Sequence, residues 1–298
     1  MIRRGSVLTS VTVALVGTLL GANGVGAAPA SSAAIPVFDH IYLIVMENHD
    51  YGAIVGNAQA PYINGLIASG GLATQWYATT HPSQPNYLAL FAGSTFGIVD
   101  DGVHHLQHTN LVDQLAAAHR TWRVYAQDYP GNCSPAASAA GPVDLAGLAG
   151  TYVRKHDPAM SFTDISGSAT RCARISRLTG FDPAAADVEL IVPNLSNDMH
   201  DGTIAQGDSF LRSFVPMITG SAAFANSLLV ITWDEGSSNL GGGGHVATIL
   251  VSGAVVAGTR SAVHHDHFSW LRTVEDAWGL PCMRSTCQAA DLGEFFTH

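Results

Sequence analysis

The sequence has little lysine and no long apolar segment after residue 30. Its 298 residues hold 13 Lys and Arg against 23 Asp and Glu, a formal net charge of −10, and Lys155 is the one lysine. Nucleic-acid binding needs basic side chains clustered against phosphates, so we expect no nucleic-acid partner. Since no later run is long enough to cross a bilayer, we also expect no stable membrane insertion. The sequence leaves the oligomeric state open.

Residues 1–30 have the features of an export signal. Arg3 and Arg4 form a basic start, residues 11–20 (VTVALVGTLL) a short apolar core, and residues 26–30 (GAAPA) a small-residue cleavage zone. We therefore expect a signal peptide at 1–30, for general secretion or twin-arginine export, and a secreted, extracellular protein. Residues 31–298 are long enough for one large domain with a well-buried core, and we predict a single domain there.

Cysteine is also scarce, with four residues and no CxxC pair. This argues against a zinc site built from cysteines. An even number in an exported chain favours disulfides instead. Cys282 and Cys287 flank the short loop MRST and are expected to pair, which leaves Cys133 with Cys172. Spacing alone leaves the other pairings open.

Apolar, β-branched runs alternate with helical patterns along the chain. We predict strands at 38–46, 72–77, 122–127, 188–192, 227–233 and 246–251, and helices at 61–69, 86–91, 110–120, 208–214 and 267–278. We interpret 130–187, rich in Ala, Gly, Ser and Pro, as an irregular excursion. The glycine run at 241–244 is predicted to be a flexible loop and not a P-loop, because no Lys-Ser or Lys-Thr follows it. The alternation predicts an α/β fold with a mostly parallel central sheet flanked by helices.

Several predicted strands end abruptly in polar clusters: MENHD after the first, NLSNDMHD after 188–192 and WDEG after 227–233. Ligands gather at the carboxyl ends of parallel strands, so we expect these clusters to converge. Glu47, Asn48, Asp234 and Glu235 offer the oxygen atoms that hard cations prefer, and we predict a divalent cation such as calcium, magnesium or manganese. The alternative is that these carboxylates are ordinary solvated loop residues.

Ser83 is the candidate nucleophile, with His81 two residues before it. Pro85 suits the first turn of a helix and Gly93 suits its end, so Ser83 is expected at the positive pole of that helix, where an oxyanion is favoured. Ser83 as a simple helix cap is the alternative. His200, between Asp198 and Asp201, is a candidate for proton transfer. The histidine groups 104, 105, 108 and 264, 265, 267 are expected to lie in solvated loops, with His267 near the site.

The motifs MENHDYG, HPSQPNYLALFAGST, NDMHDG followed by IAQGD, ITWDEG and GGHV resemble the bacterial phosphoesterase family of secreted acid phosphatases and phosphatidylcholine-type phospholipases C. They cover nearly the whole chain after residue 30, in the family's order. NYLALFAG, NDMHDG with IAQGD, and NSLLV with TWDE are similar to the short secreted acid phosphatases of actinobacteria. The resemblance implies an alkaline-phosphatase-like sheet and a phosphoserine or phosphothreonine intermediate.

The resemblance also implies roles for particular residues. The family's metal-binding pairs fall on Glu47-Asn48 and Asp234-Glu235, and its nucleophile falls on Ser83. Related nucleotide pyrophosphatases use a Thr-x-Pro-Asn start followed by a glycine, and the matching residues here are Ser83, Pro85, Asn86 and Gly93.

The family's acid/base and phosphate-contacting histidines map onto His200 and His245, which complete the catalytic set with Ser83 and its neighbour His81. Substrate contacts are assigned to Asn48, Asn86, His200 and Asp201. Two positions depart from the phospholipase pattern: His49 and Tyr51 replace the Arg and Phe of MENRSF, and the loop before His245 lacks the usual preceding Asp.

These features predict a secreted, metal-dependent phosphomonoesterase of the acid phosphatase type, acting through a phosphoserine on phosphate monoesters, with phosphoinositides as candidate substrates. One alternative is a phospholipase C or another phosphodiesterase that uses the same site. The other is a non-catalytic secreted cation-binding protein. No G-x-S-x-G surrounds Ser83, which argues against an α/β-hydrolase, and Tyr87 stands where sulfatases need Arg.

Overall fold

The computed structural model describes residues 1–2, 34–143 and 149–296. The chain divides into two units, residues 1–31 and 32–298, and the second is the folded domain. The predicted signal peptide lies outside the described residues except for Met1 and Ile2. Within the described ranges, every helix is too short or too polar to cross a membrane.

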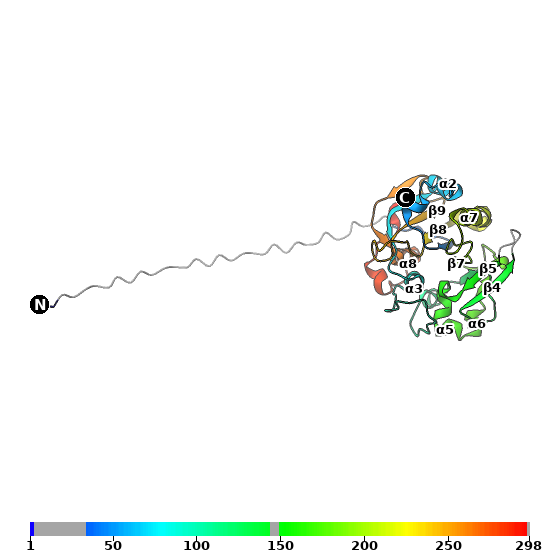
Figure 1. Ribbon diagram of the computed structural model, residues 1–298, viewed down its shortest axis with the longest axis horizontal. Helices are drawn as coiled ribbons and strands as arrows, with labels where there is room; N and C mark the ends of the chain where they lie inside the picture. The colour runs from blue at the N-terminus through cyan, green and yellow to red at the C-terminus, as the bar shows by residue number, and fades with distance from the viewer. Residues whose placement is uncertain (3–33, 144–148, 297–298) are drawn as a thin grey trace. The chain divides into compact units, whose positions relative to one another are not determined.

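A nine-stranded sheet forms the centre of the domain (Figure 1). Its order is β10-β2-β9-β8-β1-β7-β3-β6, with β11 also paired to β2. The strands are β1 (His40–Met46), β2 (Gly71–Tyr77), β3 (Trp122–Ala126), β6 (Ile175–Arg177), β7 (Val188–Val192), β8 (Ser227–Trp233), β9 (His245–Val251), β10 (Thr259–Ser261) and β11 (His265–Asp266). β9 runs antiparallel to β2 and β8, and the other described pairings in this sheet are parallel. The predicted mostly parallel sheet is confirmed.

Helices cover this sheet. They are α1 (Tyr51–Ile54), α2 (Pro61–Ser69), α3 (Ser83–Ala92), α4 (Leu111–Ala117), α5 (Thr163–Ser166), α6 (Ala169–Cys172), α7 (Ile204–Thr219) and α8 (His267–Ala277). α2 packs with α7 and α3 with α8, and Figure 1 shows these two pairs on opposite sides of β8 and β9. The predicted helix at 208–214 is longer because a capping box between Thr203 and Gln206 starts α7 earlier.

Helix α3 lies inside the domain, and all ten of its residues are buried. It begins at Ser83, three residues before the predicted start. It ends at Ala92 and is capped by Gly93, whose φ of 64° is left-handed. A Cβ there would lie 2.4 Å from the Met283 carbonyl oxygen, so glycine is required for space as well as for backbone conformation.

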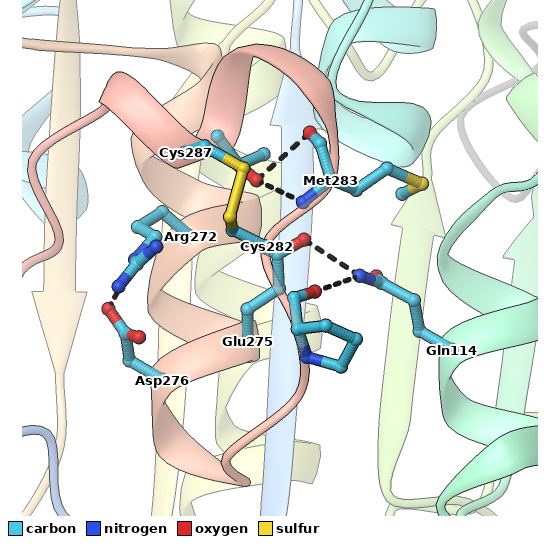
Figure 2. Close-up of a disulfide and its surroundings, with 9 residues drawn as sticks. Gln114, Arg272, Glu275, Asp276, Cys282, Met283 and Cys287 are labelled. Carbon is cyan, nitrogen blue, oxygen red and sulfur yellow. Dashed lines mark hydrogen bonds and ion pairs between the residues drawn. A yellow bond between two sulfur atoms is a disulfide. The ribbon is translucent and has the colours of Figure 1, made fainter.

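The segment after α8 closes the carboxyl end of α3. Arg284 donates to the Ala92 carbonyl over 2.8 Å, and the Ser285 N–H donates to the Gly93 carbonyl over 3.1 Å. The disulfide Cys282–Cys287 closes this loop, as predicted. Figure 2 shows the disulfide beside α8, with Gln114 of α4 approaching the same segment.

The prediction of an irregular excursion at 130–187 is wrong in part. β4 (Ser138–Val143) and β5 (Ala149–Val153) form a separate antiparallel pair, and β6 adds an edge strand to the main sheet. The predicted disulfide Cys133–Cys172 is confirmed. Short 3-10 turns occupy Arg154–His156, Pro158–Ser161 and Leu178–Gly180 here, and Ala222–Asn226, Arg284–Gln288 and Gly293–Phe295 elsewhere. Elements this short carry too little periodicity to be recognised from sequence.

Candidate active site

Three buried carboxylates meet where β1, β7 and β8 end. Met46 lies opposite Trp233, so Glu47 and Asp234 leave the sheet side by side. The Asp234 N–H donates to the Met46 carbonyl and the Glu47 N–H donates to the Asp198 carbonyl, each over 2.8 Å. Glu47, Asp198 and Asp234 are all 0% exposed. The expected convergence of polar strand ends is therefore present.

Ser83, the first residue of α3, faces this cluster. Its Oγ lies 3.3 Å from Glu47 Oε2 and 3.4 Å from Glu235 Oε1, and the residue is 1% exposed. The hydroxyl thus contacts two of the four predicted metal ligands, at the end of a helix where partial positive charge accumulates.

His81 is paired with Glu235. Its Nδ1 lies 2.7 Å from Glu235 Oε2, and its Nε2 lies 2.9 Å from the Ser238 carbonyl oxygen. Both partners are acceptors, so both ring nitrogens must carry protons to donate. Burial opposes this charge, but the Ser238 carbonyl and the charge of Glu235 raise the pKa of His81 above its usual value. His81 is therefore an imidazolium, and it pairs with the Glu235 carboxylate that contacts Ser83 Oγ.

His156 is a site residue that the sequence reasoning missed. It is 1% exposed, with Nε2 3.1 Å from Glu47 Oε1 and Nδ1 3.4 Å from Asp198 Oδ2. The angles make neither contact a hydrogen bond. Its ring stacks on Tyr87, whose hydroxyl donates to Glu47 Oε1 over 2.5 Å. The run Lys155-His156-Asp157 after β5 was the available signal, and it lies in the segment interpreted as irregular.

Burial dominates the electrostatics of these groups. It raises the pKa of Glu47 and of Asp198 well above the usual range, and the charge of Asp234 adds to both shifts. Burial, then the charge of Glu235, raises the pKa of Asp234 to about 7. Burial and the charge of Lys155 hold the pKa of His156 well below its usual value. The protein alone therefore supplies too little positive charge to keep all the carboxylates ionised.

His200 lies at the edge of the cluster. Its Nδ1 is 2.7 Å from Asp201 Oδ1, and its Nε2 is 3.4 Å from Lys155 Nζ. Lys155 can only donate, so Nε2 accepts and Nδ1 carries the proton that is donated to Asp201. The His200 N–H also donates to Asp198 Oδ1 over 2.7 Å, which links this loop to the buried carboxylates.

Two further predicted residues, Asn48 and Asn86, make hydrogen bonds beside the cluster. The Asn48 N–H donates to Asp234 Oδ1 over 3.2 Å. Asn86 accepts from the N–H groups of Thr79 and Thr80, and its own amide donates to the carbonyls of Thr80 and Pro82, so it holds the loop before Ser83 in place.

His245 is sandwiched between Tyr51 and Tyr77, with ring centroids 4.4 and 5.0 Å away. Its Nε2 lies 3.0 Å from the Thr74 carbonyl oxygen. It begins β9, and because β9 is antiparallel to its neighbours, this beginning lies at the carboxyl edge of the sheet.

The predicted flexible glycine loop packs tightly against the nucleophile loop. A Cβ at Gly242 or Gly243 would lie 2.2 Å from the Thr79 or Thr80 carbonyl oxygen, respectively. The Gly243 N–H donates to the Ala78 carbonyl over 2.9 Å. The glycines therefore allow backbone to approach backbone.

Two of the histidines expected in solvated loops are buried. His265 is 1% exposed and bonds Glu294 over 2.7 Å. His267 is 0% exposed, and its Nε2 lies 2.5 Å from the Asp234 carbonyl oxygen, so it does lie near the site. The expected solvated loop was wrong for His265, which belongs to β11 and pairs with β2, whereas His267 starts the predicted helix near the site but is buried there.

The cluster has the composition of a cation site. One ligand atom each from Glu47, His156 and His200 lie within 4.8 Å of one another. In the described chain, Asp234 Oδ2, Asp198 Oδ2 and both nitrogens of His156 are buried without a hydrogen bond. A divalent cation would satisfy such atoms and compensate the carboxylate charge, so the residues fit one.

Curated proteins related to this chain are phosphatases. A model of the Phosphoesterase family matches residues 57–281. A phosphatidylinositol-3-phosphatase of Mycobacterium tuberculosis is 37% identical over 279 residues, covering 90% of this chain and 88% of that protein. A probable acid phosphatase of Kluyveromyces lactis is 31% identical and an acid phosphatase of Aspergillus fumigatus 28% identical, covering 82% and 86% of this chain. The match spans 59% and 58% of those two proteins, less than two thirds of their length.

Solved structures agree on the fold. A phosphonate monoester hydrolase of Silicibacter pomeroyi has a TM-score of 0.57 at 12% identity, over 87% of this chain and 76% of that one. A protein of the alkaline phosphatase superfamily from Vibrio parahaemolyticus has a TM-score of 0.55 at 12% identity, over 86% and 72%. The predicted alkaline-phosphatase-like fold is confirmed. With the family match and the phosphatase relatives, this chain belongs to the phosphoesterase family and is a hydrolase of phosphoric esters.

Proposed function

We propose that this protein is a secreted, metal-dependent phosphomonoesterase of the acid phosphatase type, with Ser83 as the phosphoryl acceptor. The observation that carries the proposal is the buried Ser83 hydroxyl at the start of α3, within 3.4 Å of both Glu47 and Glu235. A serine that merely capped the helix would need no such carboxylates around its oxygen.

The reaction begins with in-line attack of Ser83 Oγ on phosphorus, as the bond to the leaving oxygen breaks. The hydroxyl proton passes to the neighbouring carboxylates, Glu47 or Glu235. His200, held by Asp201 at Nδ1, takes a proton from water on Nε2 and gives this Nε2 proton to the leaving oxygen. Water then cleaves the phosphoserine and regenerates the hydroxyl. The imidazolium of His81 keeps Glu235 in place beside Ser83.

A divalent cation bound here would stabilise the serine alkoxide and the charge of the phosphoryl group. Glu47 and His156 would hold it in the buried cluster, and His200, whose ring lies close to both, keeps its role as the acid. Asp234 and Glu235 stand beside Glu47 and would complete the oxygen ligands, with Asn48 following on the chain. Imidazole ligands among carboxylates favour manganese or zinc over calcium.

The relatives support a substrate class. The Mycobacterium tuberculosis protein is named for phosphatidylinositol 3-phosphate, and other relatives are named acid phosphatases. We propose phosphate monoesters, including a phosphoinositide, as substrates. The signal features of residues 1–30 and the two disulfides support export to an oxidising compartment.

A substrate panel with metal stripped and restored tests the proposal. Purified protein should release phosphate from p-nitrophenyl phosphate and phosphatidylinositol 3-phosphate, and not phosphocholine from phosphatidylcholine. Ser83→Ala should remove activity, whereas Ser213→Ala, an exposed serine of α7, should not. Full turnover by Ser83→Ala would refute the nucleophile, and preferred cleavage of phosphatidylcholine would indicate a phospholipase C. Cation binding without any phosphate release would indicate a binding protein.

A further inference from the structure

We propose that Lys155 binds the phosphate of the substrate, and that the Asp101 carboxylate takes this place in the free enzyme. The inference rests on the proposed function, since it concerns the anion that Ser83 attacks. Lys155 is the one lysine of the chain, and it lies in the turn beside His156.

Lys155 is placed between two parts of the site. Its Nζ lies 2.9 Å from Asp101 Oδ2 and 3.4 Å from His200 Nε2, and its side chain is 18% exposed. The other oxygen of the same carboxylate, Asp101 Oδ1, accepts the Gln84 N–H over 3.0 Å. Gln84 directly follows Ser83. A carboxylate therefore bridges an ammonium group and a helix N–H one residue from the nucleophile.

Asp101 accepts from two donors, Lys155 Nζ and the Gln84 N–H, that could bind a substrate phosphate. The first turn of α3 offers the N–H of Gln84, but Asp101 already accepts from it, and Pro85 has no N–H to offer. Backbone donors and a lysine are the groups that bind phosphate oxygens at helix starts. Because Asp101 occupies both, a substrate phosphate must displace it to bind them.

The other charged groups around the site leave Lys155 as the cation that can bind the substrate phosphate. Glu47, Asp198, Asp234 and Glu235 surround the Ser83 side, and His81 is engaged by Glu235. In the described chain the arginine ion pairs lie elsewhere, with Asp113, Asp164, Asp187, Asp208 and Asp276. Arg154, the neighbour of Lys155, donates to the carbonyls of Met160 and His104 instead. A phosphate dianion therefore finds its permanent side-chain cation in Lys155.

Displacing Asp101 is feasible. Its side chain is 32% exposed, so its ion pair with Lys155 is partly screened by water and contributes little. A phosphate dianion carries more charge and more acceptor oxygens than a carboxylate, so it competes well for the same donors. In the free enzyme, Asp101 would keep the Lys155 side chain oriented. When substrate binds, its phosphate would replace the Asp101 carboxylate at Lys155.

Selective chemistry on the folded wild-type chain tests this directly. Lys155 carries the one ε-amine, so acetylation of amines at about pH 8 modifies Lys155 and the α-amino group at the chain start, and peptide mass spectrometry separates the two. Inorganic phosphate at ten times its inhibition constant should slow acetylation of Lys155 about tenfold, by simple occupancy. The α-amino rate is the internal control, and potassium chloride at equal ionic strength is the salt control. Equal Lys155 rates in phosphate and chloride would overturn the proposal.

Variants separate binding from a merely structural ion pair. Lys155→Met should raise the inhibition constant of inorganic phosphate about 10- to 100-fold, the effect of one charge-assisted hydrogen bond, and Lys155→Arg should raise it less. Asp101→Asn should lower the same constant, because the competing anion is gone. A structural ion pair predicts instead that Lys155→Met and Asp101→Asn shift it in the same direction, and that outcome would refute the proposal.

The acetylation experiment remains interpretable if Lys155→Met misfolds, and it can be separated from the test of the proposed function. If Lys155→Met does not fold, the protection experiment on the wild-type chain still decides. Protection is also measured without turnover and works on Ser83→Ala. Failure of Ser83→Ala to lose activity would therefore count against the proposed function alone, whereas failure of protection would count against Lys155 alone.

Discussion

Ser83 Oγ lies 3.3 Å from Glu47 Oε2, which joins the first residue of α3 to the residue that follows β1. The contact arises because the local sequence sets both the end of β1 and the start of α3. β1 is apolar except for His40 and ends at Met46, one residue before Glu47, and α3 begins where Pro82 and Pro85 favour a helix start. A buried carboxylate and a buried hydroxyl are thereby held together by a strand and a helix that are both almost wholly buried.

Glu47→Gln tests the cation site from its centre. The amide keeps the size of the side chain and removes its charge, so bound metal and phosphatase activity should both fall by more than about 100-fold. Metal content after dialysis, measured by plasma mass spectrometry, checks this without relying on activity. Asp100→Asn, an exposed carboxylate with its partner in His104, is the matched control and should change neither. Normal metal content in Glu47→Gln would place the cation elsewhere.

His156→Asn tests the residue that sequence reasoning missed. Its ring is buried between Glu47 and Asp198, and its low pKa keeps it neutral, as a ligand must be. We expect affinity for manganese or zinc to fall about 10- to 100-fold by calorimetry. His108→Asn removes a ring that stacks on Phe96 and should leave the affinity unchanged. Equal affinities for the wild type and His156→Asn would exclude it as a ligand.

The sequence predicted the parts of this site that follow long, buried strands. The runs ending at Met46 and Trp233 are almost continuously apolar, so their ends and the polar residues after them are recognisable without a structure. His156 could not be found this way. It follows the short strand β5 in a segment of small residues, and its partners Glu47 and Asp198 are distant in sequence.

Strand direction was also beyond the sequence. A buried apolar strand has the same sequence pattern whether it runs parallel or antiparallel to its neighbours. The antiparallel direction of β9 could therefore not be predicted. That reversal decides where His245 lies, since it puts the start of β9 beside the end of β2. The stacking of its ring between Tyr51 and Tyr77 depends on the packing of three separate elements.

Glu189 should give the protein higher stability in acid. Burial raises its pKa from 4.5 to about 8, and the charge of Asp182 adds to the shift. The unfolded chain ionises this group above about pH 4.5 while the folded chain stays protonated to about pH 8, so its contribution is full below pH 4.5 and is lost as the pH rises to 8. In Glu189→Gln, Tm should exceed that of the wild type increasingly across this range. The exposed Asp39→Asn should show no such trend, and a gap between Glu189→Gln and wild type that is constant with pH would contradict the account.

The disulfide loop at the end of α3 should stabilise that helix. Replacing Cys282 and Cys287 by serine opens a short loop, which should lower the free energy of unfolding by about 2 kcal/mol. Hydrogen exchange should quicken at the Gly93 and Ser285 amides, which lie at this contact, while exchange in α7 stays unchanged. Unchanged exchange at Gly93 would show that the loop does not hold the end of α3.

The most direct test of the central claim is to trap the phosphorylated enzyme. Protein mixed with p-nitrophenyl phosphate and quenched in acid within milliseconds should carry one phosphate on the peptide that contains Ser83, and fragmentation should place it on that residue. The label should disappear as turnover ends and should be missing from Ser83→Ala. Rapid turnover with the phosphate on another residue, or with no covalent phosphate at any quench time, would contradict Ser83 as the phosphoryl acceptor.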